Sequence, residues 1–113
     1  MKNFIKNGLV FGSCGAVEYW KEDKPHRLDG PAVKYPNGSE YWYVEGKLHR
    51  EDGPAVHLAN GHKEYTIHGV LHRLDGPALE YASGTKSWFY NGKRIYCTTQ
   101  EEFEKLLRLK AFW

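Results

Sequence analysis

One motif that occurs three times in this sequence groups residues that could do chemistry. Each copy reads His-Arg-x-Asp-Gly-Pro-Ala, and the copies begin at His26, His49 and His72, 23 residues apart. Histidine can ligate a metal or transfer a proton, arginine can bind an anion through two parallel hydrogen bonds, and aspartate can pair with either. The motif therefore suggests a metal site, a catalytic loop, or a ladder of charged side chains.

Geometry disfavours a metal site built from the three histidines. If each unit contributes at least two strands at about 4.8 Å spacing, equivalent residues lie about 10 Å apart. Zinc–nitrogen bonds are about 2.0–2.1 Å long, so the three side chains cannot share one ion. A kinase-like catalytic loop is disfavoured as well, because Leu28, Glu51 or Leu74 interrupts the His-Arg-Asp run. We expect no catalytic residue, no metal and no cofactor, and hence a protein that is not an enzyme.

Two hypotheses remain for the arginines. Arg27, Arg50 and Arg73 would line one edge at regular intervals, and a basic ladder beside exposed aromatic rings could bind a nucleotide or a single-stranded nucleic acid. Alternatively, each arginine pairs with an aspartate of its own or a neighbouring loop and joins unit to unit. Recurrence favours this structural interpretation, because a residue needed for stacking must recur whereas a ligand contact need not. The candidate binding residues are Arg27, Arg50, Arg73, His26, His49, His72, Tyr41, Tyr43 and Phe89.

The motifs must be positioned by repeated elements, because a fixed period of this size is typical of repeat architectures. Each full unit reads as a short strand, a glycine turn, a longer strand and a second tight turn, which predicts a β-hairpin. The first unit lacks the motif, as terminal units often do. The predicted array spans residues 1–97, with an atypical unit 1–25 and full units 26–48, 49–71 and 72–94.

Alternation of apolar and polar residues assigns the faces of the strands. Val33 and Tyr35 share one side of a short strand, and Trp42 and Val44 share one side of the longer strand that follows. Both sets are apolar in every unit, so together they predict a core ladder. The opposite side, which includes Tyr41, differs between units, as a partner-facing surface would. The aromatic members of the predicted core ladder are Trp42, Tyr65 and Trp88.

The two ends of the chain differ from the repeated units. Near the N-terminus, Lys6-Asn7-Gly8 lies between two apolar runs, which predicts a hairpin that pairs residues 3–5 with residues 9–11. Residues 98–113 change to helical spacing, and two threonines each precede a glutamate by three residues, as in a capping box. We expect this helix to cap the open edge of the last hairpin. Its apolar stripe comprises Phe103, Leu106 and Leu107.

Composition and charge limit the class of protein. The 113 residues include four Trp, eight Tyr and five Phe, as expected of a small β protein with aromatic cross-strand pairs. A net charge of +2, spread along the chain, does not demand a polyanionic partner. Cys14 and Cys97 could form one disulfide or stay as free thiols, and a reducing compartment favours the thiols. No run approaches the about 18 apolar residues of a membrane span, so a cytoplasmic protein is expected.

Further local features recur across residues 15–94. They include Gly46-Lys47-Leu48-His49, the turn at Asn60-Gly61, and an aromatic residue such as Trp42 four residues before a turn glycine. With the period, these features resemble a divergent version of the MORN repeat family, in which His-Arg-x-Asp-Gly-Pro-Ala replaces His-Gly-x-Gly. Similar arrays occur in bacterial and phage proteins. The resemblance implies an elongated sheet of stacked hairpins. The functions of the family include membrane-lipid contact, scaffolding and partner binding, and the resemblance assigns none of them to particular residues of this sequence.

The expected fold is therefore mostly β. Stacked 23-residue β-hairpin repeats form one extended twisted sheet, and a C-terminal α-helix caps it. The expected function is non-enzymatic binding of a protein partner, as a small adaptor or as an inhibitor, which the resemblance suggests is phage-encoded and acts on a host protein. The alternative is nucleotide or nucleic-acid binding through the arginines and histidines. A homodimer formed through a sheet edge also stays open.

Overall fold

The chain folds as strands followed by one helix, in a computed structural model that describes residues 5–12 and 14–109. Within these residues there are 14 strands, all paired antiparallel, and a single helix. This confirms the prediction of a mostly β fold with a C-terminal helix. The elements are β1 (Gly8–Phe11), β2 (Val17–Lys21), β3 (Lys24–Pro25), β4 (Val33–Lys34), β5 (Glu40–Tyr41), β6 (Tyr43–Val44), β7 (Lys47–Leu48), β8 (Val56–His57), β9 (Lys63–Glu64), β10 (Thr66–Ile67), β11 (Val70–Leu71), β12 (Leu79–Glu80), β13 (Lys86–Tyr90), β14 (Lys93–Ile95) and α1 (Gln100–Leu109).

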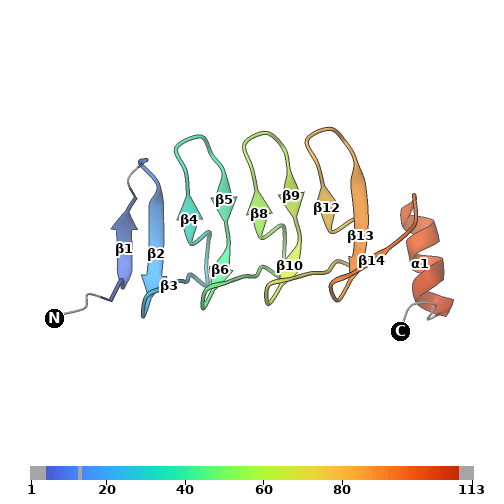
Figure 1. The fold of residues 1–113 in the computed structure, drawn as a ribbon, viewed down its shortest axis with the longest axis horizontal. Helices are drawn as coiled ribbons and strands as arrows, with labels where there is room; N and C mark the ends of the chain where they lie inside the picture. Colours follow the sequence, from blue (N-terminus) through green and yellow to red (C-terminus); the bar gives the residue numbers. More distant parts are fainter. Residues whose placement is uncertain (1–4, 13, 110–113) are drawn as a thin grey trace.

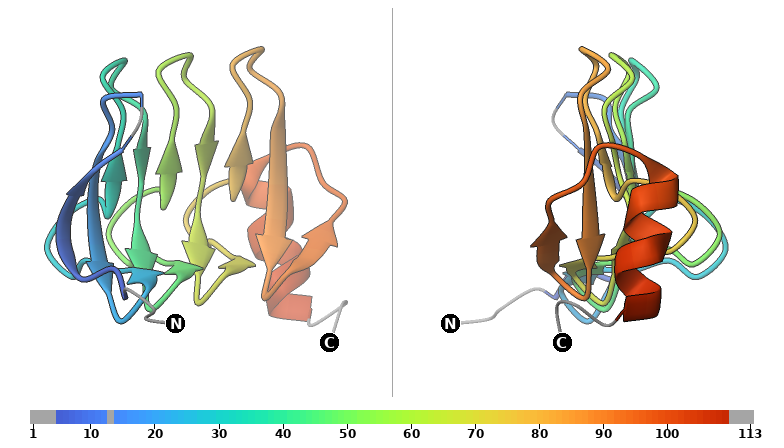
Figure 2. Two further views of the ribbon diagram at one scale, coloured as in Figure 1. Left: turned by 60° about the vertical axis from the view of Figure 1, so that its left-hand side comes forward. Right: turned by 90° about the vertical axis from the view of Figure 1, so that its right-hand side faces the viewer.

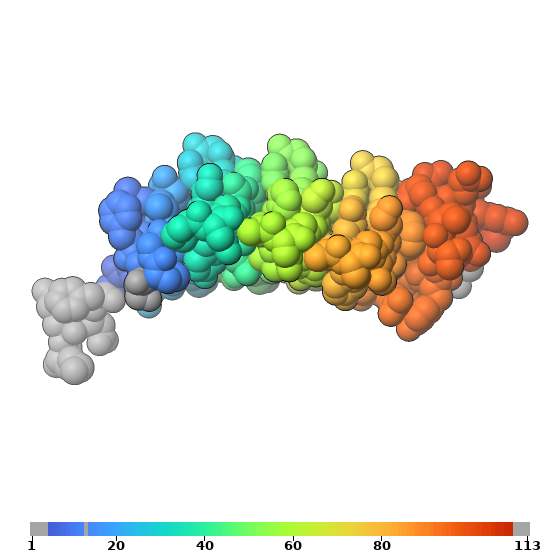
Figure 3. Space-filling model, turned by 90° about the horizontal axis from the view of Figure 1, so that it is seen from above, coloured from blue at the N-terminus to red at the C-terminus, as the bar shows by residue number. Residues whose placement is uncertain are grey.

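Ten of the strands form one sheet, and the strands along it lie in the order of the sequence (Figure 1). The order is β1-β2-β4-β5-β8-β9-β12-β13-β14, with β3 paired to β2, while β6–β7 and β10–β11 form two short ribbons. The molecule measures 56 × 28 × 24 Å, and Figure 3 shows successive segments side by side along the long axis. Its radius of gyration of 16.4 Å exceeds the about 13 Å of a compact domain of this length, so the fold is elongated.

The strand register shows that the predicted core ladder is wrong. Val33 pairs with Tyr41, and Tyr41 pairs in turn with Val56. Directly opposed residues point to the same face of a sheet, so these valines share a face with Tyr41. Trp42, one residue further on, belongs to the opposite face. The alternation within each strand was predicted correctly, but the relation between strands depends on the number of residues in the connecting turn.

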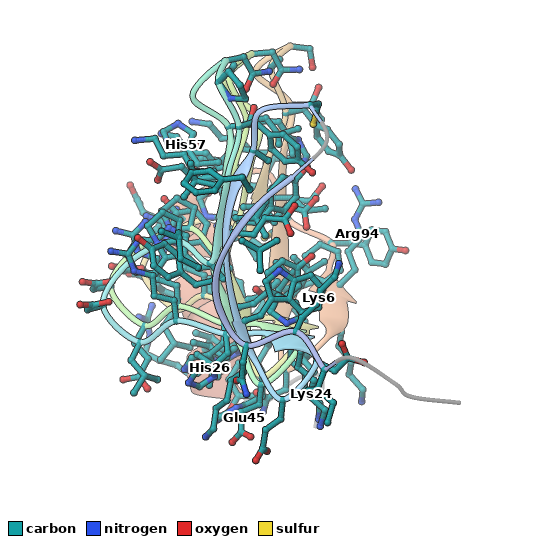
Figure 4. The ribbon with its side chains drawn as sticks, turned by 90° about the vertical axis from the view of Figure 1, so that its left-hand side faces the viewer. Lys6, Lys24, His26, Glu45, His57 and Arg94 are labelled. Carbon is teal, nitrogen blue, oxygen red and sulfur yellow. The ribbon has the colours of Figure 1, made fainter. Side chains whose placement is uncertain are left out.

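The two faces of the sheet are covered differently. Figure 2 shows the three motif loops (residues 26–32, 49–55 and 72–78) and α1 on the same side, which we call the loop face. The end-on view of Figure 4 places His57 on this side and Lys6 on the other. The opposite side, called the tyrosine face, carries the side chains of Tyr35, Tyr41 and Tyr43.

Small residues let each motif loop return closely to the sheet. Ala32, Ala55 and Ala78, the last residue of each motif, are fully buried. Their carbonyl oxygens accept the backbone N–H groups of Tyr19, Trp42 and Tyr65 over 2.7–2.8 Å. The end of each loop is therefore hydrogen-bonded to the backbone of the preceding unit. The interior is thin, because the array is one sheet deep.

The N-terminal hairpin differs from its prediction. β1 pairs with β2, placing Leu9 opposite Tyr19, and Ile5 forms no strand. The predicted partners at positions 3 and 4 lie outside the described residues. Asn7 does not form a turn with Gly8, because its Oδ1 atom accepts the backbone N–H of Glu22 at 3.0 Å. The Asn-Gly signal is local, and here a contact 15 residues away decides the conformation.

The C-terminal helix closes a cluster of buried apolar side chains. Thr99 Oγ1 accepts the N–H of Glu102 at 3.1 Å, and the carboxylate of Glu102 accepts the N–H of Thr98, so the second of the two capping patterns starts α1. Phe103 is fully buried and packs against Trp88 and Ile95. The predicted extension of the helix through residues 110–113 lies outside the described residues. The described part of the chain has no helix that is long and apolar enough to cross a membrane.

Candidate interaction surface on the motif loops

Each motif arginine is bound by its own loop and by an aromatic ring of the preceding unit. Arg50 Cζ lies 3.8 Å from the centroid of the Trp42 ring, a cation–π contact. Its Nε donates to Asp52 Oδ1 at 3.0 Å, and its Nη1 donates to the carbonyl oxygen of Pro54 at 3.3 Å. Arg27 and Arg73 make the same three types of contact. Each arginine thus pairs with the aspartate of its own loop and not with one in the next loop.

The motif glycine leaves room for the guanidinium group. A Cβ atom added to Gly53 would lie 2.7 Å from Arg50 Cζ, which is closer than real Cβ atoms approach. The same distance applies at Gly30 with Arg27 and at Gly76. Glycine recurs at these positions because the arginine folds back over the loop backbone. Its φ angle there is not in the left-handed region.

The motif histidines each hold a tight turn further along the array. His26 Nδ1 accepts the backbone N–H of Glu45 at 2.9 Å, and the two residues lie together below the sheet in Figure 4. His49 and His72 accept the N–H groups of His68 and Asn91 at the same distance. An accepting Nδ1 must be unprotonated. These bonds assign the histidines a structural role, and metal clusters of three or more His, Cys, Asp or Glu are absent from residues 5–12 and 14–109.

The loops present carboxylates to solvent and cover their guanidinium groups. The arginine side chains are 21–30% exposed, whereas the aspartates paired with them are 84–89% exposed. Glu51 is 82% exposed and lies 3.4 Å from His49 Nε2. The hydrogen bond from Arg50 holds the pKa of Asp52 below its usual value, so this carboxylate stays charged. The carboxylates are therefore the outermost charged groups of the loops, and the middle loop has one more carboxylate, Glu51, than arginine.

Two open grooves separate the three motif loops. The first, of about 440 Å³, lies between loops 26–32 and 49–55. The second, of about 380 Å³, lies between loops 49–55 and 72–78. Every residue that lines the first groove has its counterpart 23 positions later in the second, which Asp52 and Gly53 also line. The first groove includes Leu28, Trp42, Val44 and His49, and the second includes Glu51, Tyr65, Ile67 and His72.

The next position in this series is filled by α1. The residues equivalent to the groove lining are Leu74, Trp88, Tyr90 and Ile95. Gln100 Oε1 accepts the indole N–H of Trp88 at 2.8 Å, and Gln100 Nε2 donates to the Leu74 carbonyl at 3.0 Å. Phe103 packs on Trp88, with Leu106 and Leu107 beside it. A helix therefore occupies the place where a third groove would lie.

The candidate aromatic residues lie away from the arginines and histidines. Tyr41 stacks on Tyr43 with their centroids 6.4 Å apart, on the tyrosine face. Burial, followed by the charge of Tyr41, raises the pKa of Tyr43 above its usual value. Phe89 lies two units further along, at the position equivalent to Tyr43, about 20 Å away at two strands per unit. The structure therefore does not bring the nine candidate residues into one site.

The sequence named the motif arginines and histidines that line the grooves, but missed the other groove residues. Leu28, Glu51 and Leu74 occupy the variable position of the motif, and Leu28 is 76% exposed. This position is the only one that changes between the three motif copies, which is the signal that could have identified it. Val44 and Ile67 were assigned to the core, whereas they line the grooves.

The environment of Cys97 does not favour a nucleophile. Cys14 and Cys97 are both free thiols, the first exposed and the second half-buried. Burial, with a smaller effect from the nearby Glu102 carboxylate, raises the pKa of the Cys97 thiol. A raised pKa lowers the fraction of reactive thiolate.

Comparison with known proteins adds no family assignment. No family model matches this chain, and no curated protein matches it.

Proposed function

We propose that this protein is a non-enzymatic binding module for a protein partner, acting as a small adaptor or inhibitor. The module consists of stacked 23-residue hairpin repeats in one extended sheet, a divergent relative of the MORN repeats. By the same resemblance it is phage-encoded and acts in the cytoplasm on a host protein. The geometry that supports this function is a long surface with open grooves on the loop face.

One observation carries the proposal. The residues that repeat in the motif are used in internal contacts, whereas the residue that varies is exposed. Arg50 is only 21% exposed and has three partners, but Leu28 and Leu74 are 76% and 53% exposed. Exposed apolar residues at a position that changes to Glu51 in the middle unit suit recognition of a specific protein surface. The outward carboxylates disfavour a nucleic acid, whose phosphates they would repel.

Affinity capture tests the proposed function. The full chain, immobilised, is exposed to a candidate host lysate, and bound proteins and nucleotides are identified by mass spectrometry. We expect a stoichiometric protein partner that is lost when Leu28 and Leu74 are both replaced by aspartate. Both side chains are exposed, so circular dichroism should show an unchanged fold. Recovery of a nucleotide or nucleic acid alone, released by salt, would instead support the arginine-based alternative.

A further inference from the structure

We propose that the loop face binds one amphipathic helix of the partner, which lies across the motif loops. The helix places one apolar side chain in each open groove and its basic side chains against the carboxylates at the rim. This inference rests on the proposed function of protein binding and specifies its surface and its ligand. It is argued from the spacing of the grooves, the residues that line them, and the charge around them.

The spacing of the grooves matches one helical repeat. Each unit adds two strands to the sheet, so equivalent points lie about 9.6 Å apart at about 4.8 Å per strand. Residues i and i+7 of an α-helix lie about 10.5 Å apart and on nearly the same side. A helix across the loops therefore brings two apolar side chains into the two grooves without distortion. In an extended strand, residues at this spacing would alternate between faces.

The residues around the grooves are equivalent, one or two units earlier, to residues that pack against the apolar side chains of α1. At the next position in the series, Phe103 of α1 packs on Trp88, the equivalent of Trp42. The open grooves keep an aromatic floor, Trp42 or Tyr65, and an aliphatic wall, Val44 or Ile67. Each groove is large enough for one or two side chains but not for a whole helix. The partner helix must therefore rest on the loops and insert only its side chains.

One polar atom is left without a partner in the first groove. The indole N–H of Trp88 donates to Gln100, whereas the buried Nε1 atom of Trp42 has no acceptor among the described residues. A buried donor without an acceptor costs about 1–3 kcal/mol.

The charge of the rim selects a basic helix. Glu51 and Asp52 line both grooves, and both are more than 80% exposed. Asp29 and Asp75, in the outer loops, are exposed to the same degree. The arginines beside them are largely covered and already paired. Lysine or arginine residues flanking the apolar side chains of the partner helix would therefore meet outward-facing carboxylates, of which Glu51 lies against His49 and not against an arginine.

Synthetic peptides test the proposed geometry directly. One helical peptide of about 18 residues carries leucines at positions i and i+7 with flanking lysines, and a second has the same composition with leucines at i and i+5. Binding to the full chain is measured by fluorescence anisotropy, and the indole N–H signal of Trp42 is followed by NMR. We expect the i, i+7 peptide to bind at least tenfold more tightly and to shift the Trp42 signal. Equal binding of the two peptides, or no binding of either, would contradict the proposal.

Charge variants show whether the carboxylates at the groove rim bind the peptide specifically or whether any charge on the surface has the same effect. Glu51→Lys should weaken binding of the i, i+7 peptide about tenfold, because it reverses a carboxylate between the grooves. Glu101→Lys makes the same charge change on an exposed residue of α1 and should leave binding unchanged. If both variants weaken binding equally, the rim has no specific role and the proposal fails. Tighter binding of a polyproline peptide with apolar side chains at i and i+3 would also overturn it.

A captured protein partner distinguishes this inference from the proposed function. If the partner binds through the loop face, Val44→Lys should abolish capture, whereas Tyr41→Lys on the opposite face should not. If Tyr41→Lys abolishes capture and Val44→Lys does not, the protein-binding function stands and the helix-binding inference fails. If the chain captures no protein, both fail.

Discussion

At the scale of single residues, the His-Arg-x-Asp-Gly-Pro-Ala motif is a set of interdependent contacts. The arginine covers an aromatic ring, the aspartate and the proline carbonyl bind the guanidinium, and the glycine leaves space for it. The histidine accepts a hydrogen bond from a turn 19 residues later. The variable residue and the outward side of the aspartate are left for recognition. The arginine–aspartate pairing could be anticipated from recurrence, but the stacking on Trp42 and the histidine bonds could not, because they depend on how the strands are placed.

Replacing Arg50 should therefore destabilise the fold. Arg50→Ala removes a cation–π contact and two charged hydrogen bonds, and we expect the free energy of unfolding to fall by about 2 kcal/mol. Arg50→Lys keeps the charge but not the planar fork, so it should recover less than half of the loss. Urea denaturation measures both, with Arg108→Ala, an exposed residue of α1, as the control. Unchanged stability in Arg50→Ala would mean that this arginine is free to bind a ligand.

His72 should make the fold sensitive to acid. Burial lowers the pKa of His72 below its usual value, and the neutral ring accepts the N–H of Asn91. The unfolded chain then binds the proton more readily, so the stabilisation is complete above the usual pKa of about 6.5 and declines as the pH falls below it. His72→Asn keeps an acceptor oxygen, as Asn7 does for Glu22, and should reduce this pH dependence. Urea denaturation at pH 7.5 and 5.5 measures it, and an equal decline in both proteins would contradict the assignment.

At the scale of elements, the tight turns and α1 determine how well the array is formed. Each turn that is bonded to a motif histidine has two successive residues with positive φ, such as Glu45 at 50° and Gly46 at 82°. The sequence indicated the turns, the strands and the helix from their periodicity and glycines. It did not indicate the register between strands, so Val33 and Trp42 were assigned to one face although they lie on opposite faces. Register is set by turn geometry and by contacts between units, which no single stretch of sequence contains.

Exchanging turn residues should change stability in opposite directions. Glu45 has φ 50°, a left-handed conformation that asparagine adopts more readily, and Asn91 occupies the equivalent position with φ 47°. We expect Glu45→Asn to stabilise the protein by about 1 kcal/mol and Asn91→Glu to destabilise it by a similar amount. Thermal denaturation of both variants checks this. Changes of the same sign would show that the turns differ in conformation.

Among single substitutions in α1, truncation of Phe103 should lower the stability of the protein most. Its ring is fully buried against Trp88 and Ile95, so Phe103→Ala should cost about 3–5 kcal/mol. The exposed Trp88 surface should also promote association of the chains, visible by analytical ultracentrifugation. Leu109→Ala, at a position that is 65% exposed, is the control and should change neither property. A minor effect of Phe103→Ala would show that α1 does not cover the end of the sheet.

At the scale of the whole molecule, the fold separates scaffold from surface. The molecule is 56 Å long but its sheet is one layer deep and offers little interior, so hydrogen bonds and ring contacts between neighbouring segments replace a thick core. The elongated shape could be anticipated from the 23-residue period. The two grooves could not, because they arise where loops separated by 23 residues leave a gap that α1 fills only at the C-terminal end.

The central claim is that the motif histidines and arginines belong to the scaffold and leave recognition to the residues between them. The most direct test is the NMR scalar coupling across the hydrogen bonds from backbone N–H to histidine Nδ1. We expect a coupling for each of three pairs, His26 with Glu45, His49 with His68, and His72 with Asn91. Histidine rings that are protonated at Nδ1 at neutral pH, with no coupling at any of the three, would contradict the claim.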